Sequence, residues 1–341
     1  MQPKRRIQGL AIATLMTAGP VAAHANWDQV VERAKGEHSV VLYTSDGASQ
    51  CAKENFAAFR TKYGIEVQVL AGRGSEVQER VRTEQASGRF GGDLYINGGA
   101  PMIIAGRANG LEPLGDIPNR KNLRPEVRDI GGDTFVAHAV PQLGMLINPR
   151  LVNAETELAS WQDLTNPKWK GRILSDDLRV PGGGSVFFAV THAAFGDDFH
   201  RKLLQNGIVW SSSPLTDGRR IAQGEYAIYV PQQTRNLSAF NGLPVRYWVP
   251  KEGVPYYGHY AAILAKAPHP NAARLLLNHM LDVESQANCA NAGSAPSVIG
   301  VSESINEPFR TILSSRLLGT QPVDIDVSNA TTAKAIEIYG K

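Results

Sequence analysis

The sequence predicts an α/β protein whose sheets are mainly parallel and flanked by helices. Apolar strand-like runs alternate with amphipathic helical segments through the first half of the chain, and the alternation resumes in the second half. Polar, glycine-rich loops follow several of the expected strands. With 341 residues, of which 43% are hydrophobic, the chain has material for about two such units.

The first unit is expected to contain strands and helices in strict alternation. The helices are predicted at Trp27–Lys35, Gln50–Tyr63 and Ser75–Ser87, and the strands at Ser39–Tyr43, Ile65–Leu70 and Asp93–Ile96. Phe56 and Phe59 lie on one face of the second helix, and Gly64 provides its C-terminal stop. Ser75 and Gln78 have the spacing of a capping box at the start of the third helix. This order predicts parallel pairing of the strands.

The second unit is expected to begin with the strand-rich segment Val136–Asn148. Further strands are predicted at Gly171–Ser175, Tyr226–Val230 and Ala261–Ala265, a loop at Trp161–Lys170, and helices at Val186–Phe195, 217–223, Asn271–Asp282 and 326–339. The glycine run Gly182–Ser185 directly precedes the apolar helix, so it is expected to form the N-terminus of that helix.

Polar loops follow all three strands of the first unit, at Thr44–Ser49, Gly72–Glu76 and Asn97–Ala100. In a parallel sheet these loops share the edge beyond the carboxyl ends of the strands, where ligands bind. Two of them lead into helix N-termini, as does Gly182–Ser185, and unpaired N–H groups there favour anions. Glycine and serine also form ordinary turns, but three such loops in register predict a binding rim.

The first 25 residues have the pattern of a secretory signal peptide. Basic residues at positions 4–6 precede the apolar run Leu10–Ala23, and Ala23 and Ala25 form a small-x-small cleavage site. The apolar run is shorter than the roughly 20 residues that span a bilayer, which argues against the alternative of an uncleaved anchor. The protein is therefore expected in the periplasm after cleavage following Ala25, through either the general or the twin-arginine route.

The charge balance excludes one class of function. The signal carries three of the 35 basic residues and none of the 32 acidic ones, so the mature chain has 32 of each and no net charge. A nucleic-acid-binding protein would show a basic excess, so no nucleic-acid partner is expected. The sequence contains no serine-hydrolase elbow, zinc-protease helix or dinucleotide fingerprint, and it gives no reason to assign a catalytic residue, a cofactor or a metal.

Cys51 and Cys289 are the two cysteines of the chain. In an oxidising compartment they could form a disulfide, and closing so long a loop would stabilise the fold by roughly 4–5 kcal/mol in the chain-entropy model. Two buried free thiols are the alternative, because the sequence does not give the separation of the Cα atoms.

Three parts of the sequence resemble the ferric-binding-protein family, the periplasmic receptors of ABC importers. They are Trp161–Ile173 (WQDLTNPKWKGRI), Gln223–Ile228, and Ala261–Lys266 followed by Pro270–Ala273. The resemblance spans the mature chain and implies a two-lobed periplasmic-binding-protein fold, with crossover strands at a hinge that closes on the ligand. It places residues 26–113 and 259–305 in lobe 1, and residues 114–258 and 306–341 in lobe 2. It also implies an inner-membrane ABC permease as partner, and a monomer is expected.

The iron ligands of that family are not matched in this sequence. The position of a family His in the first loop holds Gly47 or Ala48, and that of an acidic residue after the third strand holds Gly98. The consecutive tyrosine pair of the family falls on Thr234 and Arg235. Arginine repels a ferric ion but binds carboxylate or phosphate through its fork of N–H donors. The resemblance therefore implies the family fold without its metal site.

We therefore expect a receptor for a small anion, namely an organic phosphate, a phosphonate or a carboxylate, and not an enzyme. The loop that holds an anion in the family corresponds to Gly182–Ser185, which keeps its glycine-rich character. The expected ligand-binding residues are Ser45, Asp46, Gly47, Arg73, Ser75, Asn97, Gly98, Gly183, Gly184, Ser185, Gln233, Thr234, Arg235, Tyr256 and Tyr257.

Three alternatives stay open at this point. The first is ferric iron held by Tyr229, Tyr256 and Tyr257 with an accompanying anion. The second is an exported hydrolase that uses Ser75 or Ser185, although the sequence offers no positioned His base for either. The third is a receptor that presents its ligand to a sensor instead of a permease.

Overall fold

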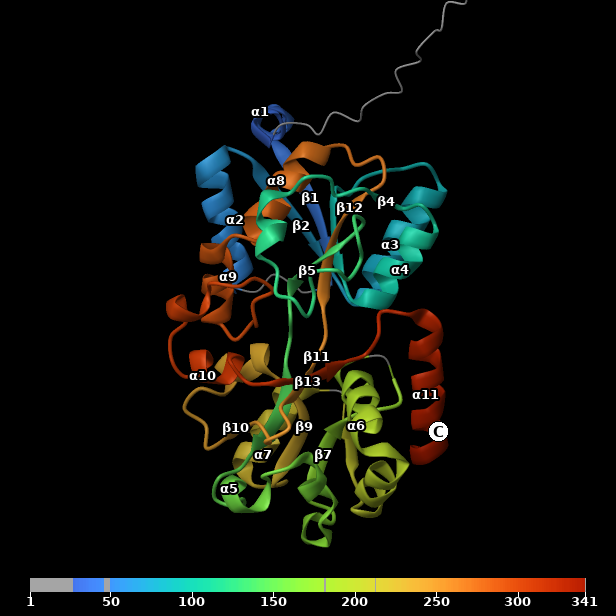
Figure 1. The fold of residues 1–341 in the computed structure, drawn as a ribbon, viewed down its shortest axis with the longest axis vertical. Coiled ribbons are helices and arrows are strands. Elements are labelled where there is room, and N and C mark those ends of the chain that lie inside the picture. Colours follow the sequence, from blue (N-terminus) through green and yellow to red (C-terminus); the bar gives the residue numbers. More distant parts are fainter. Residues whose placement is uncertain (1–26, 46–49, 181, 212, 341) are drawn as a thin grey trace, which may run out of the picture.

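The computed structural model describes residues 27–45, 50–180, 182–211 and 213–340, which fold into two α/β lobes (Figure 1). The lobes lie end to end along the long axis, with strands β11 (Val254–Tyr256) and β13 (Leu317–Thr320) between them. The predicted signal peptide lies outside the described residues, as do Asp46 and Gly47. Within the described part of the chain, every helix is too short or too polar to cross a membrane.

The first lobe is built on a six-stranded sheet with the order β2-β1-β3-β12-β4, in which β5 also pairs with β12. Its strands are β1 (Ser39–Thr44), β2 (Glu66–Ala71), β3 (Leu94–Asn97), β4 (Leu111–Glu112), β5 (Val136–Ala139) and β12 (His259–Leu264). Strand β1 is parallel to β2 and β3, whereas β12 is antiparallel to β3, β4 and β5. The helices of this lobe are α1 (Trp27–Glu37), α2 (Gln50–Tyr63), α3 (Gly74–Ala86), α4 (Gly99–Arg107), α8 (Pro270–Met280), α9 (Val283–Ala290) and α10 (Phe309–Leu313), with the 3-10 helices η1 (Pro118–Asn122) and η5 (Ser302–Ser304).

Two apolar layers hold the first lobe together, one on each face of its sheet. Successive strand residues point to opposite faces, so their side chains divide between the layers. Leu42 and Leu94 join the layer that includes Phe59 of α2. Their neighbours Tyr43 and Tyr95 join the other layer, beneath α3 and α4. Helices on both faces of the sheet confirm the predicted α/β class.

The second lobe contains a five-stranded sheet with the order β10-β6-β9-β7-β8. Its strands are β6 (Leu143–Ile147), β7 (Ile173–Asp176), β8 (Val209–Ser211), β9 (Ile228–Gln233) and β10 (Arg246–Trp248). Strand β7 is parallel to β8 and β9, and β6 is antiparallel to β9 and β10. The helices are α5 (Ala154–Glu157), α6 (Gly183–Gln205), α7 (Pro214–Gln223) and α11 (Ile325–Tyr339), with η2 (Trp161–Thr165), η3 (Pro167–Trp169) and η4 (Thr234–Phe240).

Most predicted elements are confirmed within a few residues, and the differences have local causes. The helix predicted at Val186–Phe195 is the first part of α6, which continues after a break at Gly196, where φ is 71°. The predicted loop Trp161–Lys170 contains the two short 3-10 helices η2 and η3. The capping box predicted for α3 is wrong, because the carboxylate of Glu76 instead accepts the N–H of Arg73 at 3.0 Å.

The chain leaves the first sheet later than the predicted lobe boundary at residue 114. Leu114, Ile117 and Leu123 pack in the apolar layer of the first lobe that includes Phe59. Strand β5 then pairs with β12, so the chain enters the second sheet only with β6. The long-range pairing of β5 decides this, and no local pattern in the sequence indicates it.

Cys51 and Cys289 form a disulfide, which decides between the two alternatives left open by the sequence. Their Cα atoms are 5.0 Å apart, and the bond joins α2 to α9 across 238 residues of sequence. The disulfide therefore connects the beginning of the first lobe to the segment that returns to it.

Candidate functional site: an interlobe cavity

A cavity of about 300 Å³ lies between the two lobes, and we call it the interlobe cavity. Its walls come from the starts of α4 and α6, the end of β9, the connection from β11 to β12, and the segment from β13 to α11. Elements connected to both sheets thus face the same space. A ligand here would contact both lobes at once, and this is the arrangement that lets a ligand favour one position of a hinge.

The wall from the first lobe is the N-terminus of α4, where Gly98 is the N-cap residue. Asn97 fixes this turn, because its Oδ1 accepts the N–H of Gly98 at 2.9 Å. The amide nitrogen of Asn97 donates to the carbonyl oxygen of Gly74 at 2.9 Å and to the hydroxyl of Tyr95 at 2.8 Å. A Cβ on Gly99 would lie 2.7 Å from a methyl group of Val323 after β13, so a larger residue there would require Val323 to move. A neutral amide therefore shapes this wall.

The wall from the second lobe is the N-terminus of α6. Some of the backbone N–H groups there already donate hydrogen bonds to other groups of the protein. The Oγ of Ser185 donates to the carbonyl oxygen of Gly182 at 3.0 Å and accepts the N–H of the same residue at 3.1 Å. The N–H of Gly184 donates to Oδ2 of Asp176 at 2.9 Å. A Cβ on Gly184 would collide with the carbonyl oxygen of Asp177. Close backbone contact therefore requires the glycine here.

Asp176 is a residue of this wall to which the sequence analysis assigned no role. Its carboxylate also accepts the N–H of Asp177 at 3.1 Å. Burial raises the pKa of this carboxyl group, and the charges of Asp177 and Asp217 raise it further, while the N–H of Gly184 acts in the opposite direction. The sequence pattern that could have predicted this role is an acidic residue at the end of a strand, a few residues before a glycine-rich helix start. Its negative charge opposes that of an anion at the same helix.

The end of β9 and the hinge supply the polar side chains of the cavity. The hydroxyl of Tyr257 donates to Oε1 of Gln233 at 3.2 Å. This hydrogen bond links the connection from β11 to β12 with the end of β9. Arg235, in η4, is the single Lys or Arg among the described residues that line the cavity, and Asp324 is the single Asp or Glu. The carboxylate of Asp324 accepts two N–H groups at the start of α11, at 2.8 and 3.1 Å. Arg235 is therefore the lining group best suited to an anion.

Six of the predicted residues line this cavity, and two more lie directly behind it. The lining residues are Gly98, Gly183, Ser185, Gln233, Arg235 and Tyr257. Asn97 and Gly184 contribute through the hydrogen bonds that shape α4 and α6. Residues predicted from loops far apart in sequence thus meet in one place.

The predicted residues at the start of α3 lie elsewhere. The side chain of Arg73 is 85% exposed, and its Nε donates to Oε1 of Glu76 at 2.8 Å. Ser75 is also exposed. Ser45 bonds through its backbone to β3 and does not line the interlobe cavity. The rim predicted from three loops in register therefore reduces to one of them, the start of α4.

The three tyrosines considered for a ferric site do not meet. Tyr229 is fully buried inside the second lobe, and Tyr256 packs into the apolar layer of the first lobe that faces α3 and α4. Burial raises the pKa of both phenols, which disfavours the phenolate that a ferric ion needs. Only Tyr257 lines the cavity, and Thr234, beside Arg235, is buried as well. No three His, Cys, Asp or Glu residues of the described chain are grouped so that they could hold a metal.

Several lining residues come from a segment that the sequence analysis did not connect with the site. Thr320, Gln321 and Asp324 lie between β13 and α11, and Tyr260 lies in β12. The ring of Tyr260 packs edge-on against Phe135, with centroids 5.3 Å apart. The pairing of β13 with β11 brings residues 320–324 to the cavity, and this long-range contact has no motif of its own.

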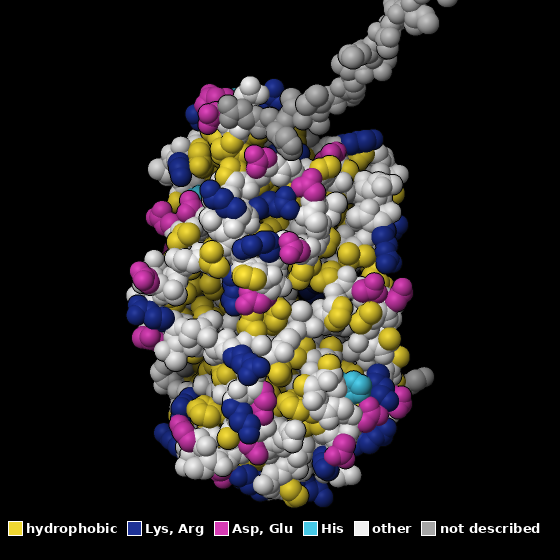
Figure 2. All heavy atoms as spheres, in the orientation of Figure 1, with side chains coloured by type: hydrophobic (Ala, Val, Ile, Leu, Met, Phe, Trp, Pro, Cys, Tyr) yellow, Lys and Arg dark blue, Asp and Glu magenta, His cyan; other side chains and the backbone are white. Residues whose placement is uncertain are grey.

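Charged side chains of both signs are interspersed on the face drawn in Figure 2. Lys and Arg side chains lie next to Asp and Glu side chains over both lobes, so this face offers no broad basic field. This distribution agrees with the equal numbers of basic and acidic residues at positions 26–341.

Comparisons with known proteins agree with this architecture. Residues 54–307 match the family model described as "Bacterial extracellular solute-binding protein". A Haemophilus influenzae protein described as uncharacterized is 27% identical over 300 residues, which cover 81% of this chain and 80% of that protein. The sequence resemblance to periplasmic receptors of this kind is thereby confirmed.

Solved structures of the same fold match nearly the whole chain. IdiA (FutA) of Trichodesmium, in complex with iron and citrate, matches with a TM-score of 0.72 at 18% identity, covering 88% of this chain and 98% of that one. AfuA of Actinobacillus pleuropneumoniae, with exogenous fructose-6-phosphate bound, matches with a TM-score of 0.65 at 19% identity and the same coverages. At these identities the structures confirm the two-lobed fold.

Proposed function

Because the chain belongs to the bacterial extracellular solute-binding protein family, whose members bind small molecules for ABC-transporter permeases, we propose that it captures a small anion between its lobes. The ligand class is an organic phosphate, a phosphonate or a carboxylate. One observation carries the proposal: glycine-rich helix N-termini from both lobes and Arg235 line a single cavity of about 300 Å³. The permease that receives the ligand is part of the same proposal.

The chemistry of these walls suits an anion. The first N–H groups of a helix have no intrahelical acceptor, and the helix dipole adds positive potential at that end. Glycines at 98, 99, 182 and 183 let a ligand approach the backbone closely. The guanidinium of Arg235 adds a forked donor that matches carboxylate and phosphate oxygens. Each contact is modest alone, but together they enclose a ligand of this charge.

A ligand that contacts both lobes changes the balance between the open and closed forms. Open and closed forms of a hinged receptor differ by a few kcal/mol, and a ligand shifts them only by its difference in affinity. A ligand bound to α4 alone would leave the hinge equilibrium unchanged. Contacts with α4 on one lobe and with Arg235 and α6 on the other favour closure, and the closed form is what a permease would recognise.

The rival functions have less support in the described residues. Ferric binding through Tyr229, Tyr256 and Tyr257 would need two phenols that are buried in separate lobes. A hydrolase would need a base within hydrogen-bond reach of its serine. Ser185 bonds instead to the carbonyl oxygen of Gly182, and none of the described lining residues of the cavity is a histidine.

Calorimetric titration with inorganic phosphate, methylphosphonate, acetate and ferric citrate tests the proposal. We expect the phosphate or phosphonate to bind, and Arg235→Gln and Arg235→Lys to weaken that binding by at least about tenfold, since a hydrogen bond to a charged group contributes on that scale. Arg82→Gln, an equivalent change on the exposed face of α3, serves as the control. Unchanged affinity in both Arg235 variants, or binding of ferric ion alone, would overturn the proposal.

A further inference from the structure

A second cavity, of about 340 Å³, also has Arg235 in its lining. We call it the disulfide cavity, because Cys51 and Cys289 form part of its wall. The rest of the first-lobe wall comes from the ends of β1, β3 and β5, the first turns of α2, Met280 of α8, α9 and residues 292–295. Arg235 is the one described residue that lines both cavities. The two spaces therefore share this residue in their walls.

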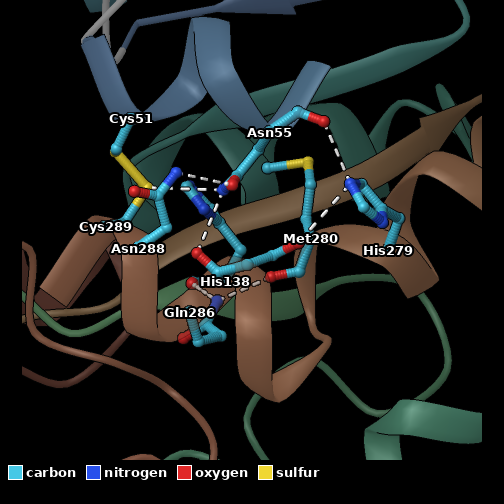
Figure 3. The surroundings of a disulfide bond; sticks show 9 residues. Cys51, Asn55, His138, His279, Met280, Gln286, Asn288 and Cys289 are labelled. Atoms are coloured by element: carbon cyan, nitrogen blue, oxygen red, sulfur yellow. Dashed lines mark hydrogen bonds between the residues drawn. A yellow bond between two sulfur atoms is a disulfide. The ribbon is translucent and has the colours of Figure 1, made fainter. Parts of the chain in front are cut away.

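The wall of the disulfide cavity is fixed by covalent and hydrogen bonds (Figure 3). The disulfide joins α2 to α9, and the amide nitrogen of Asn55 donates to the carbonyl oxygen of Ser285 at 3.0 Å. Oδ1 of Asn55 accepts from the side chain of Asn288 at 3.0 Å. Gln286 donates to the carbonyl oxygen of His138 at 2.8 Å. A space held open by its own framework binds a ligand without the cost of ordering new groups.

The side chains that face this space are mostly apolar. The apolar members of its wall are Leu42, Ala52, Phe56, Ile96, Ala139, Met280, Ala292 and Ala295, and the sulfur atoms of the disulfide join them. The amides of Asn55 and Gln286 are engaged by the protein itself through the bonds above. The other polar lining residues are Thr44, His138, Arg235, Asn236, Ser285 and Ser294. Such a wall favours an uncharged organic group over water or an ion.

We propose that the disulfide cavity holds the organic substituent of the ligand whose anionic group lies in the interlobe cavity. This inference rests on the proposed function and narrows the ligand class. The ligand is an organic anion with a compact apolar substituent, such as a ring or a branched chain, and is not inorganic phosphate. Arg235, which lines both cavities, holds the charged end while the apolar end is buried beside Phe56 and Met280.

Paired titrations with inorganic phosphate and phenylphosphonate test the inference. The wild-type protein is expected to bind phenylphosphonate at least about tenfold tighter than phosphate, since burial of one ring contributes on that scale. Ala52→Leu fills the cavity from the inner face of α2 and is expected to abolish the difference while leaving phosphate affinity unchanged. Ala292→Leu, on a different segment of the wall, gives an independent version of the same change. The control Ala58→Leu places the same side chain on the exposed face of α2 and should retain the wild-type preference.

The outcomes distinguish a failure of this inference from a failure of the proposed function. Equal affinity for the two probes in the wild-type protein would overturn the inference and leave the proposed function standing. The same follows if both cavity-filling variants, folded by circular dichroism, bind phenylphosphonate as the wild type does. If neither probe binds the wild-type protein, the proposed function fails for phosphates and phosphonates, and the inference fails with it.

Discussion

The two helix N-termini that line the interlobe cavity are similar in sequence but differ in charge. At the start of α4, the neutral amide of Asn97 shapes the turn. At the start of α6, the carboxylate of Asp176 accepts the N–H of Gly184. Each solution satisfies backbone donors, but the second also places a negative charge beside the cavity. The comparison indicates that glycine-rich helix starts are not equivalent as anion sites, and that the start of α4 is better suited to an anion than the start of α6.

The difference also suggests how the receptor remains able to open. An anion held strongly by both lobes would keep them closed and slow its own release. On the proposed function, a carboxylate at α6 would weaken the contact of this helix with an anion, so the closed form would be favoured less than with a neutral residue there. The following changes test this comparison in order of decreasing effect.

The largest effect is expected from glycine substitutions at the two helix starts. Gly184→Ala should lower the free energy of unfolding by about 3 kcal/mol, because its Cβ would collide with the backbone of Asp177 and the backbone cannot move cheaply. Gly98→Ala should change it by less than about 0.5 kcal/mol, because its Cβ would meet no atom within 4 Å. Urea denaturation measures both values. Equal losses would show that the two starts are packed alike.

The next effect concerns the carboxylate at α6. Asp176→Asn keeps an oxygen that can accept the N–H of Gly184 but removes the charge, so binding of inorganic phosphate should tighten by about tenfold. Calorimetry measures the change. Asp198→Asn removes the same charge from a 78% exposed site on α6 that pairs with Lys202, and it serves as the control. An unchanged affinity in Asp176→Asn would mean that α6 does not contribute to the site.

The pH dependence should follow from the same residue. Burial raises the pKa of Asp176, so its carboxyl group takes up a proton in the folded protein before it does so in the unfolded chain. Affinity for a permanently charged anion such as methanesulfonate should therefore rise as the pH falls through the folded pKa. The contribution of Asp176 to stability has the same sign, being present below the unfolded pKa and lost as the pH rises through the folded one.

Asp176→Asn should remove the contribution of this residue to the pH dependence of both anion affinity and stability. The carboxyl group of Asp177, whose pKa is lowered by its hydrogen bond with Arg179, gives the opposite slope in both proteins and cancels in the difference. Titrations and urea denaturation across the acidic and neutral range, performed on wild type and variant, give that difference. Parallel curves would contradict the assignment to Asp176.

The smallest effect is expected at Arg73. Its exposed ion pair with Glu76 should contribute little to stability because water screens it, and Arg73→Ala should change ligand affinity by less than about twofold. Thermal denaturation and calorimetry with inorganic phosphate measure both quantities. A clear loss of affinity would add the start of α3 to the binding rim and make the first lobe stronger than we infer.

Local patterns in the sequence predicted the elements of the fold well. The apolar face of α2 and the glycine after Tyr63 gave both of its bounds. Both signals could be read because they lie within one short segment of sequence. The glycine run Gly182–Ser185 was correctly expected to begin a helix, whereas helix α4 after Gly98 was not predicted. Features that depend on contacts distant in sequence were not accessible in this way. Two such features are the pairing of β5 with β12 and the position of residues 320–324 in the wall of the interlobe cavity.

The tyrosine pair shows where local reasoning about the site ended. Tyr256 and Tyr257 are adjacent, and successive residues of an extended chain point to opposite sides. We predicted both as ligand-binding residues, although this alternation lets only one of them face the ligand and does not say which. The packing of Tyr256 against the first lobe decides it, because that ring is buried while Tyr257 lines the cavity. Arg73 and Arg235 were separated in the same way, by tertiary position alone.

Native mass spectrometry of the protein, purified without denaturation, tests whether the interlobe cavity binds an anionic ligand. We predict that a small organic phosphate, phosphonate or carboxylate remains bound in the wild-type protein and is absent from Arg235→Gln. A wild-type protein that instead retains iron, with the visible absorption of a tyrosinate complex, or that retains a polyamine, would contradict the proposal.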